Sequence, residues 1–328
     1  MKRFKIGYMA MGLILAIGSL ATGTYGLSKK NQEIYETAVS MDGTIRNMGF
    51  SDFSLKDYKV RFYDGKCDYV VWTNEEDVPV IRKEDAILNV FAGTTIDVDG
   101  ENQVLVPTYE QFAGLFDVLG AAETVSGGMS ESADGTIAFT EDTYSENSHV
   151  ATIWHEAFHA WQYTNWEKEV NALMERVNLS EGEGREDVIL EEVDTKKEMI
   201  TAFEDEMQLL YEAYQTEDME EKKELVSRAL FIEAEREQEL SDAANAMEYF
   251  LDNYEGSAMY VEGQVYRELE GDAAWQAYYM REFQYRNGSG KYYERGMLKC
   301  LLLDQMMEGW QSQFSGTLGL SELLEMAV

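Results

Sequence analysis

The second half of the chain contains no proline. Only two of the 328 residues are proline, and neither follows His149. Because proline interrupts helices and strand patterns are also scarce in this half, we expect helices from residue 149 to the C-terminus. Hydrophobic residues make up 45% of the chain, which is enough apolar material to form a core.

Strand patterns before residue 149 predict a small sheet. Two pairs of segments rich in β-branched and aromatic residues are each joined by an Asp-Gly dipeptide, which is the arrangement of a β-hairpin. The pairs are 58–63 with 67–73, and 94–98 with 103–106. A further strand is expected at 136–139, and apolar spacing predicts helices at 32–48 and 109–119. The predicted fold class is therefore α+β and mostly helical, with a small sheet followed by a helical subdomain.

These patterns divide the chain into three parts. Residues 1–30 form an export segment, 31–148 a helix with a small β-sheet, and 149–328 a helical subdomain. Within the last part, residues from about 166 to 249 are rich in Glu and Lys and are interpreted as a helical insertion. Breaks at 180–184 and near 216–218 divide it into at least three helices. We expect the acidic runs of this insertion to form solvated helix faces.

The N-terminus has the pattern of an export signal. Lys2, Arg3 and Lys5 precede a run without charged residues that extends from 6 to 28. This run is long enough to span a bilayer, but its second half is diluted by Gly, Ser and Thr, as near a signal-peptidase site. Two interpretations stay open, an uncleaved membrane anchor and a cleaved signal peptide. Either one predicts that the rest of the chain is exported, and an anchor also makes the membrane a partner.

The chain is strongly acidic, with 62 acidic and 27 basic side chains and a formal net charge of -35. Because nucleic-acid binders use Lys and Arg to neutralise phosphates, we expect no nucleic-acid partner. The two cysteines, Cys67 and Cys300, are far apart and form no CxxC pair, which excludes a thiolate zinc site. Whether they pair with each other stays open.

Two of only three histidines fall in one short motif, His-Glu-x-x-His, at His155, Glu156 and His159. The aromatic residues around them are Trp154, Phe158 and Trp161. Their spacing predicts a helix with one buried face and with both histidines aligned on an adjacent face. The two imidazoles can therefore share one ion.

Zinc suits such a pair of histidines. Imidazole nitrogens four residues apart on a helix can occupy two corners of a tetrahedral site. We therefore expect His155 and His159 to bind Zn²⁺, and Glu156 to act as general base toward a water that the ion activates. No later histidine exists to complete the site, so the third ligand should be a carboxylate.

At this point the chain resembles the gluzincin branch of zinc metallopeptidases, in which a glutamate on a downstream helix completes the His-Glu-x-x-His site. The usual context of that glutamate, Glu-Gly-x-Ala-x-Tyr-x-Glu, matches residues 255–262 at every fixed position. The resemblance implies Glu255 as the third metal ligand. Glu262 is the alternative candidate for the third ligand, or else it accepts a hydrogen bond from an imidazole N–H. The interval between the two motifs is longer here than in the best-known members.

The resemblance further implies a zincin-like fold and hydrolysis of a peptide or protein substrate. A donor for the oxyanion would come from Tyr260, Tyr266, Tyr285 or His149, and the substrate would lie against the strand at 136–139. Two other functions stay open. One is a surface binding protein that retains a zincin-like fold without turnover, and the other is an anchored helical interaction module.

Overall fold

The computed structural model describes residues 26–114, 144–177 and 187–328. They form two compact units. What we call the sheet unit contains the described residues up to 114, together with 144–164 and 261–275. What we call the helical unit contains the described parts of 165–260, together with 276–328.

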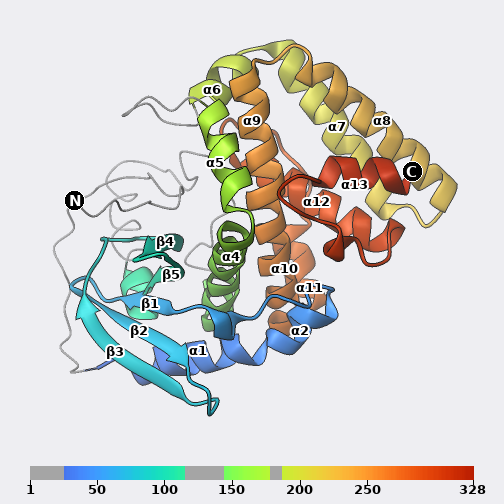
Figure 1. Ribbon diagram of the computed structural model, residues 1–328. Coiled ribbons are helices and arrows are strands. Elements are labelled where there is room, and N and C mark those ends of the chain that lie inside the picture. The colour runs from blue at the N-terminus through green and yellow to red at the C-terminus, as the bar shows by residue number, and fades with distance from the viewer. Residues whose placement is uncertain (1–25, 115–143, 178–186) are drawn as a thin grey trace. The chain divides into compact units, whose positions relative to one another are not determined.

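The sheet unit is built on a five-stranded mixed sheet in the order β3-β2-β1-β5-β4 (Figure 1). β1 and β5 are parallel, and the other neighbouring strands are antiparallel. The strands are β1 (Val60–Tyr63), β2 (Cys67–Thr73), β3 (Pro79–Asp85), β4 (Thr94–Val98) and β5 (Glu101–Pro107). Both predicted hairpins are confirmed. In the second turn Asp99 (φ 55°) and Gly100 (φ 92°) adopt the left-handed conformation that tight hairpins require.

Strand β3 was not predicted from the sequence. It pairs with β2 along its whole length, from Pro79 opposite Thr73 to Asp85 opposite Cys67. Most of its side chains are exposed, so it lacks the alternation of apolar and polar residues that marks a half-buried strand. A proline at the start and charged residues along the strand are typical of a sheet edge.

The helix α4 (Glu146–Asn165) carries the His-Glu-x-x-His motif and packs through an aromatic face. Trp154, Phe158 and Trp161 are buried, as the sequence predicted. Their rings contact those of Phe50 and Phe53, with ring centroids 5.0 to 6.0 Å apart. Because aromatic rings bury large apolar areas, these contacts fix the side of α4 that faces the core of the sheet unit.

Two helices, α1 (Lys29–Ser40) and α2 (Asp42–Asn47), replace the single helix predicted over 32–48. A turn at Met41 divides them. The carboxylate of Asp42 accepts two hydrogen bonds from the segment that follows α2, which ties the start of this helix to that segment. The apolar spacing alone did not reveal this turn.

The helical unit consists of helices joined by turns. The helices are α5 (Glu167–Arg176), α6 (Asp187–Ile189), the π-helical η2 (Leu190–Asp194), α7 (Lys197–Gln215), α8 (Met219–Glu237), α9 (Asp242–Phe250), the π-helical η3 (Leu251–Gly256), α12 (Gly290–Met306), η4 (Trp310–Ser312) and α13 (Leu320–Ala327). The predicted break at 216–218 separates α7 from α8, which lie side by side (Figure 1). η3 runs without interruption into α10 (Ser257–Glu270), and α11 (Asp272–Tyr279) follows.

The fold class, α+β and mostly helical, is confirmed. The division into three parts stays a prediction. The predicted strand at 136–139, the second half of the helix at 109–119 and the predicted break at 180–184 lie outside the described residues, as does most of the predicted export segment. Among the residues that are described, we find no helix with the length and apolarity needed to cross a membrane. Cys67 and Cys300 are both buried free thiols and do not pair.

Candidate metal centre

The side chains of His155 and His159 lie one turn apart on α4. Their ring centroids are 4.8 Å apart. Besides its aromatic face, the helix is held by the indole N–H of Trp154, which donates a 2.9 Å hydrogen bond to the carbonyl oxygen of Ala38 on α1. His159 is buried and the side chain of His155 is 13% exposed, so His155 is the more accessible of the two.

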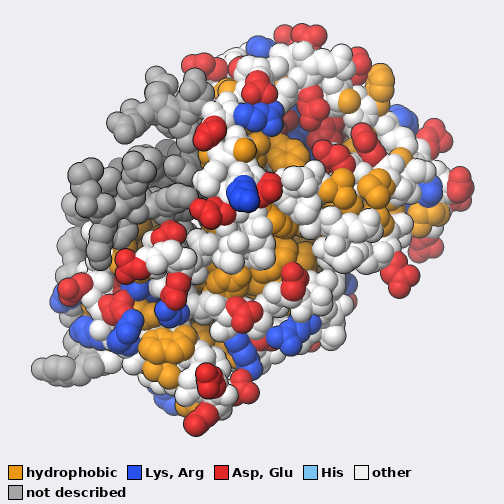
Figure 2. Space-filling view, viewed as in Figure 1, with side chains coloured by type: hydrophobic (Ala, Val, Ile, Leu, Met, Phe, Trp, Pro, Cys, Tyr) orange, Lys and Arg blue, Asp and Glu red, His pale blue; other side chains and the backbone are white. Residues whose placement is uncertain are grey.

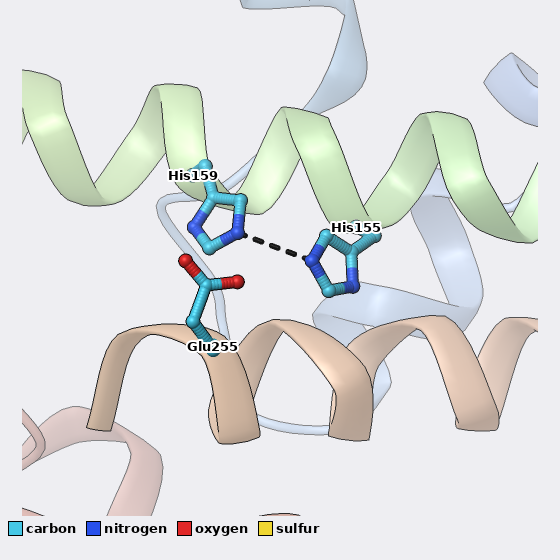
Figure 3. Close-up of side chains that lie close together, drawn as sticks. All are labelled: His155, His159 and Glu255. Atoms are coloured by element: carbon cyan, nitrogen blue, oxygen red, sulfur yellow. Dashed lines mark hydrogen bonds between the residues drawn. The ribbon is translucent and has the colours of Figure 1, made fainter. Parts of the chain in front are cut away.

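Glu255 lies in the π-helical turn η3 and is fully buried. Its carboxylate points toward the two imidazole rings (Figure 3). One ligand atom from each of His155, His159 and Glu255 lies within 4.8 Å of the other two. This buried triad could hold a metal ion.

Each of the two rings contacts a hydrogen-bond acceptor at Nδ1. Nδ1 of His155 is 2.8 Å from Oε2 of Glu262, and Nδ1 of His159 is 2.8 Å from the side-chain amide oxygen of Gln162. Because a carboxylate oxygen and an amide oxygen accept hydrogen bonds, each Nδ1 carries the proton. In a neutral ring, Nε2 then presents a lone pair.

The two Nε2 atoms face each other at 3.1 Å (Figure 3). Two lone pairs at this distance repel each other unless a cation or a shared proton lies beside both. Ligands about 2.0–2.1 Å from a tetrahedral zinc ion are about 3.3 Å from one another, so the spacing suits two corners of such a site. Two imidazoles and one carboxylate, all with little solvent exposure, are also a donor set that zinc accepts.

The sequence offered two glutamates for the third position. The structure brings Glu255 into the triad and places Glu262 at the outer nitrogen of His155. Which of them binds a metal stays a prediction. The triad contains Glu255, which is the ligand expected from the sequence. The contact of Gln162 with His159 was not predicted, because spacing places a residue on a helix face without specifying the direction of its side chain.

Glu156, the predicted general base, lies against the start of β4. It is 8% exposed. The hydroxyl of Thr95 donates a 2.6 Å hydrogen bond to the main-chain oxygen of Glu156 and lies 3.4 Å from its Oε2. A Cβ on Gly93 would lie only 2.8 Å from Cγ and Oε1 of Glu156. Sequence analysis missed both contacts, because they join segments that are far apart in the chain.

Two of the proposed oxyanion donors have their hydroxyl groups engaged elsewhere. The hydroxyl of Tyr260 donates a 2.7 Å hydrogen bond to Asp304, and that of Tyr285 donates to Asp194. Tyr260 is also buried. These contacts argue against either tyrosine as a donor to substrate.

The surroundings of His149 argue against this residue as well. It is buried, its ring stacks on that of Phe62, and its Nδ1 is hydrogen-bonded to the hydroxyl of Tyr144. Burial lowers the pKa of His149 to about 3, so its ring is neutral at physiological pH. Tyr266 is left as the tyrosine candidate. It lies on α10 one turn after Glu262, and burial raises its pKa.

Comparison with known proteins adds nothing to this geometry. No protein-family model matches the chain, and neither the curated proteins nor the solved structures include a match. The case for a metal centre therefore depends on the His-Glu-x-x-His motif and on the triad.

Proposed function

We propose that this protein is a zinc-dependent peptidase. The observation that carries the proposal is the convergence of His155, His159 and Glu255 on one point, with Glu156 next to the first ligand on the same helix. A triad formed only by core packing would not require two Nε2 lone pairs to face each other. Nor would it require a buried glutamate beside them.

The chemistry divides between the ion and the chain. A zinc ion held by this triad would supply Lewis-acid chemistry, lowering the pKa of a water to about 7 and polarising a carbonyl group. The chain supplies Glu156, whose carboxylate accepts the proton of the attacking water and passes it to the leaving amine. Thr95 and Gly93 restrict the positions that this carboxylate can take.

We propose that the substrate is a peptide that lies along β4. This strand is the last one of the sheet within the described part of the chain. Its second residue, Thr95, donates a hydrogen bond to the main-chain oxygen of Glu156. An extended peptide can add to such an edge through main-chain hydrogen bonds, which would present its backbone rather than its side chains to the site.

We also propose that the protein acts outside the cell, either anchored by its N-terminal segment or secreted. The support is the basic start and the uncharged run from 6 to 28. The site itself does not depend on this location.

Substitution of Glu156 tests the proposal. The wild-type protein should bind one equivalent of zinc and cleave members of a peptide library. Glu156→Gln should keep the zinc and lose cleavage by about 100-fold or more, because it removes the proton acceptor but no metal ligand. Glu146→Gln, at the exposed start of the same helix, is the matched control and should behave as the wild type.

Three outcomes are informative. Absence of bound zinc in the wild type contradicts the proposal. Cleavage that survives Glu156→Gln contradicts the role of this residue. Stoichiometric zinc without any product from a broad library favours instead the binding protein that retains a zincin-like fold.

A further inference from the structure

The helical unit contains a buried cluster of charged side chains beside the turn that carries Glu255. We call it the ion cluster, and none of its members is more than 6% exposed. It consists of Arg236, Arg295, Lys299, Glu206, Glu233, Glu248 and Asp252. Burying this many charges costs desolvation free energy and seldom adds stability over apolar packing. We therefore expect the ion cluster to fix local geometry.

Asp252 connects the ion cluster to η3. Nε and Nη2 of Arg295 each lie 2.8 Å from one oxygen of the Asp252 carboxylate, and Nζ of Lys299 lies 2.7 Å from Oδ2. The paired contact from a planar guanidinium fixes orientation as well as distance. Both cations belong to α12, so this helix holds the carboxylate of Asp252 from one side.

Two members of the ion cluster, Glu233 and Arg295, stay charged at neutral pH. Burial alone would raise the pKa of Glu233, but the neighbouring Lys299 and Arg295 outweigh it and lower this pKa to about 2. For Arg295 burial acts to lower the pKa, yet the surrounding carboxylates, Asp252 first, raise it well above the ordinary value. Breaking any of these pairs therefore leaves a buried charge uncompensated.

Close contact of two glycines brings α12 against the same turn. A Cβ on Gly256 would lie 2.5 Å from Cα of Gly296, and a Cβ on Gly296 would lie 2.1 Å from the main-chain oxygen of Asp252. No side chain fits in this crossing. Main-chain contact and the ion pairs of Asp252 thus fix η3 to α12 together.

The π-helical form of η3 separates the directions of Asp252 and Glu255. In an α-helix, side chains three residues apart differ in direction by about 60°. The wider π-turn advances by about 80° per residue, and the same pair then differs by about 120°. This geometry lets Asp252 bind the cations of α12 while Glu255 points toward the imidazoles (Figure 3).

We infer that Asp252 is a positioning residue for Glu255: held by Arg295 and Lys299, it fixes η3 so that the Glu255 carboxylate is in place before the metal arrives. The inference rests on the proposed function, because it takes Glu255 as a metal ligand. Zinc affinity then depends on a carboxylate that is not itself a metal ligand and that binds Arg295 and Lys299 of α12.

Matched substitutions of two buried aspartates test the inference. Asp194 is the control, since it too is buried and accepts a hydrogen bond, of 2.8 Å, from a buried lysine of α12, Lys291, but lies outside η3. Zinc dissociation constants are measured by competition with a chromophoric chelator. Asp252→Asn should weaken zinc binding about 10–100-fold. The zinc dissociation constant of Asp194→Asn should stay within about threefold of the wild-type value, when the two variants lose resistance to urea to a comparable extent.

The outcomes separate the inference from the proposed function. If the wild type binds no zinc, both are overturned. If the wild type binds zinc and folded Asp252→Asn binds it equally well, only the inference is overturned. Equal weakening by both aspartate variants also overturns it, because the effect is then a general loss of stability.

A second pair keeps the inference testable if Asp252→Asn does not fold. Arg295→Lys keeps the charge of the ion cluster and removes the paired contact with Asp252. Arg236→Lys is an equally buried change in the same cluster, but Arg236 contacts Glu206 and Glu248 rather than Asp252. Zinc binding should weaken about 10-fold or more only in Arg295→Lys. Equal affinities in both variants would overturn the inference.

Discussion

At the scale of single residues, Gly93 keeps the space that the Glu156 side chain occupies. The atoms that a Cβ at this position would meet are Cγ and Oε1 of Glu156, both at 2.8 Å, and Cγ2 of Thr152 at 3.0 Å. The Glu156 side chain is flexible, so the fold can accommodate a methyl group by moving it. The position of the proposed base is then what changes.

Gly93→Ala should therefore lower kcat while zinc stays bound. A shift of the carboxylate by about 1 Å can reduce turnover by about 10–100-fold, because proton transfer requires hydrogen-bond distance to the water. Zinc content and kcat are measured on the same preparation, and the zinc content serves as internal control. A variant with wild-type kcat would show that Gly93 does not restrict Glu156 during turnover.

His149 makes the stability of the sheet unit depend on pH. Burial lowers its pKa in the folded protein to about 3, whereas the unfolded chain has the ordinary value of about 6.5. Between these values the unfolded state binds a proton that the folded state does not. Stability is therefore fully present above about pH 6.5 and is lost as the pH falls toward 3.

His149→Phe should flatten this dependence. Phenylalanine can keep the stacking on Phe62 but has no proton to bind. The free energy of unfolding is measured in urea on metal-free protein as the pH is lowered from about 6 to about 4. It should fall by about 1.4 kcal/mol less per pH unit in the variant than in the wild type. The difference between the two proteins removes every contribution that they share. Identical slopes would contradict the low pKa of His149.

At the scale of the elements, the contrast between strands shows what local pattern can predict. The β1–β2 and β4–β5 hairpins were predicted because their Asp-Gly turns and apolar runs are local features. β3 was missed because its exposed, charged side chains carry no such pattern and its pairing with β2 alone makes it a strand. The π-helical form of η3 was missed for a related reason, since the apolar spacing of α10 and η3 resembles that of one continuous α-helix.

The candidate site divides in the same way. His155, Glu156 and His159 could be found from spacing, and the context of Glu255 identified a second helix. The contacts of Gln162, Gly93 and Asp252 could not be found, because each depends on a side-chain direction or on a contact between distant segments.

The crossing of η3 and α12 makes a prediction at this scale. Gly296→Ala places a methyl group 2.1 Å from the main-chain oxygen of Asp252 and 2.8 Å from Cα of Gly256. Since these atoms belong to the backbone, the helices must separate, and we expect a loss of about 3 kcal/mol or more in the free energy of unfolding. The measurement is urea unfolding with tryptophan fluorescence.

Gly43→Ala is the control for that measurement. Gly43 lies in α2 and has no atom within 4 Å of the Cβ position, so alanine there should raise stability by up to about 1 kcal/mol. If Gly296→Ala were as stable as the wild type, the close crossing would not exist in solution.

At the scale of the whole molecule, the excess of acidic groups is the dominant electrostatic feature. Without residues 1–28 the chain keeps 24 basic and 62 acidic side chains, a formal net charge of -38. Figure 2 shows acidic side chains spread over the visible face rather than gathered in one patch. Such a charge repels acidic ligands and attracts cationic ones at a distance, whatever the contacts at the site.

If the protein is a peptidase, cationic peptides should therefore be cleaved with higher kcat/KM than acidic peptides that share the same sequence around the cleaved bond. The charges should be placed several residues away from that bond, so that they report long-range attraction rather than contacts at the site. The Debye length falls from about 30 Å at 0.01 M salt to about 10 Å at 0.1 M, so the preference should shrink several-fold over this range. A neutral peptide of matched sequence should change little and controls for effects of salt on the enzyme. A preference that persists at high salt would instead indicate direct ion pairing of the substrate near the site, and no preference at low salt would show that the net charge does not act on substrate binding.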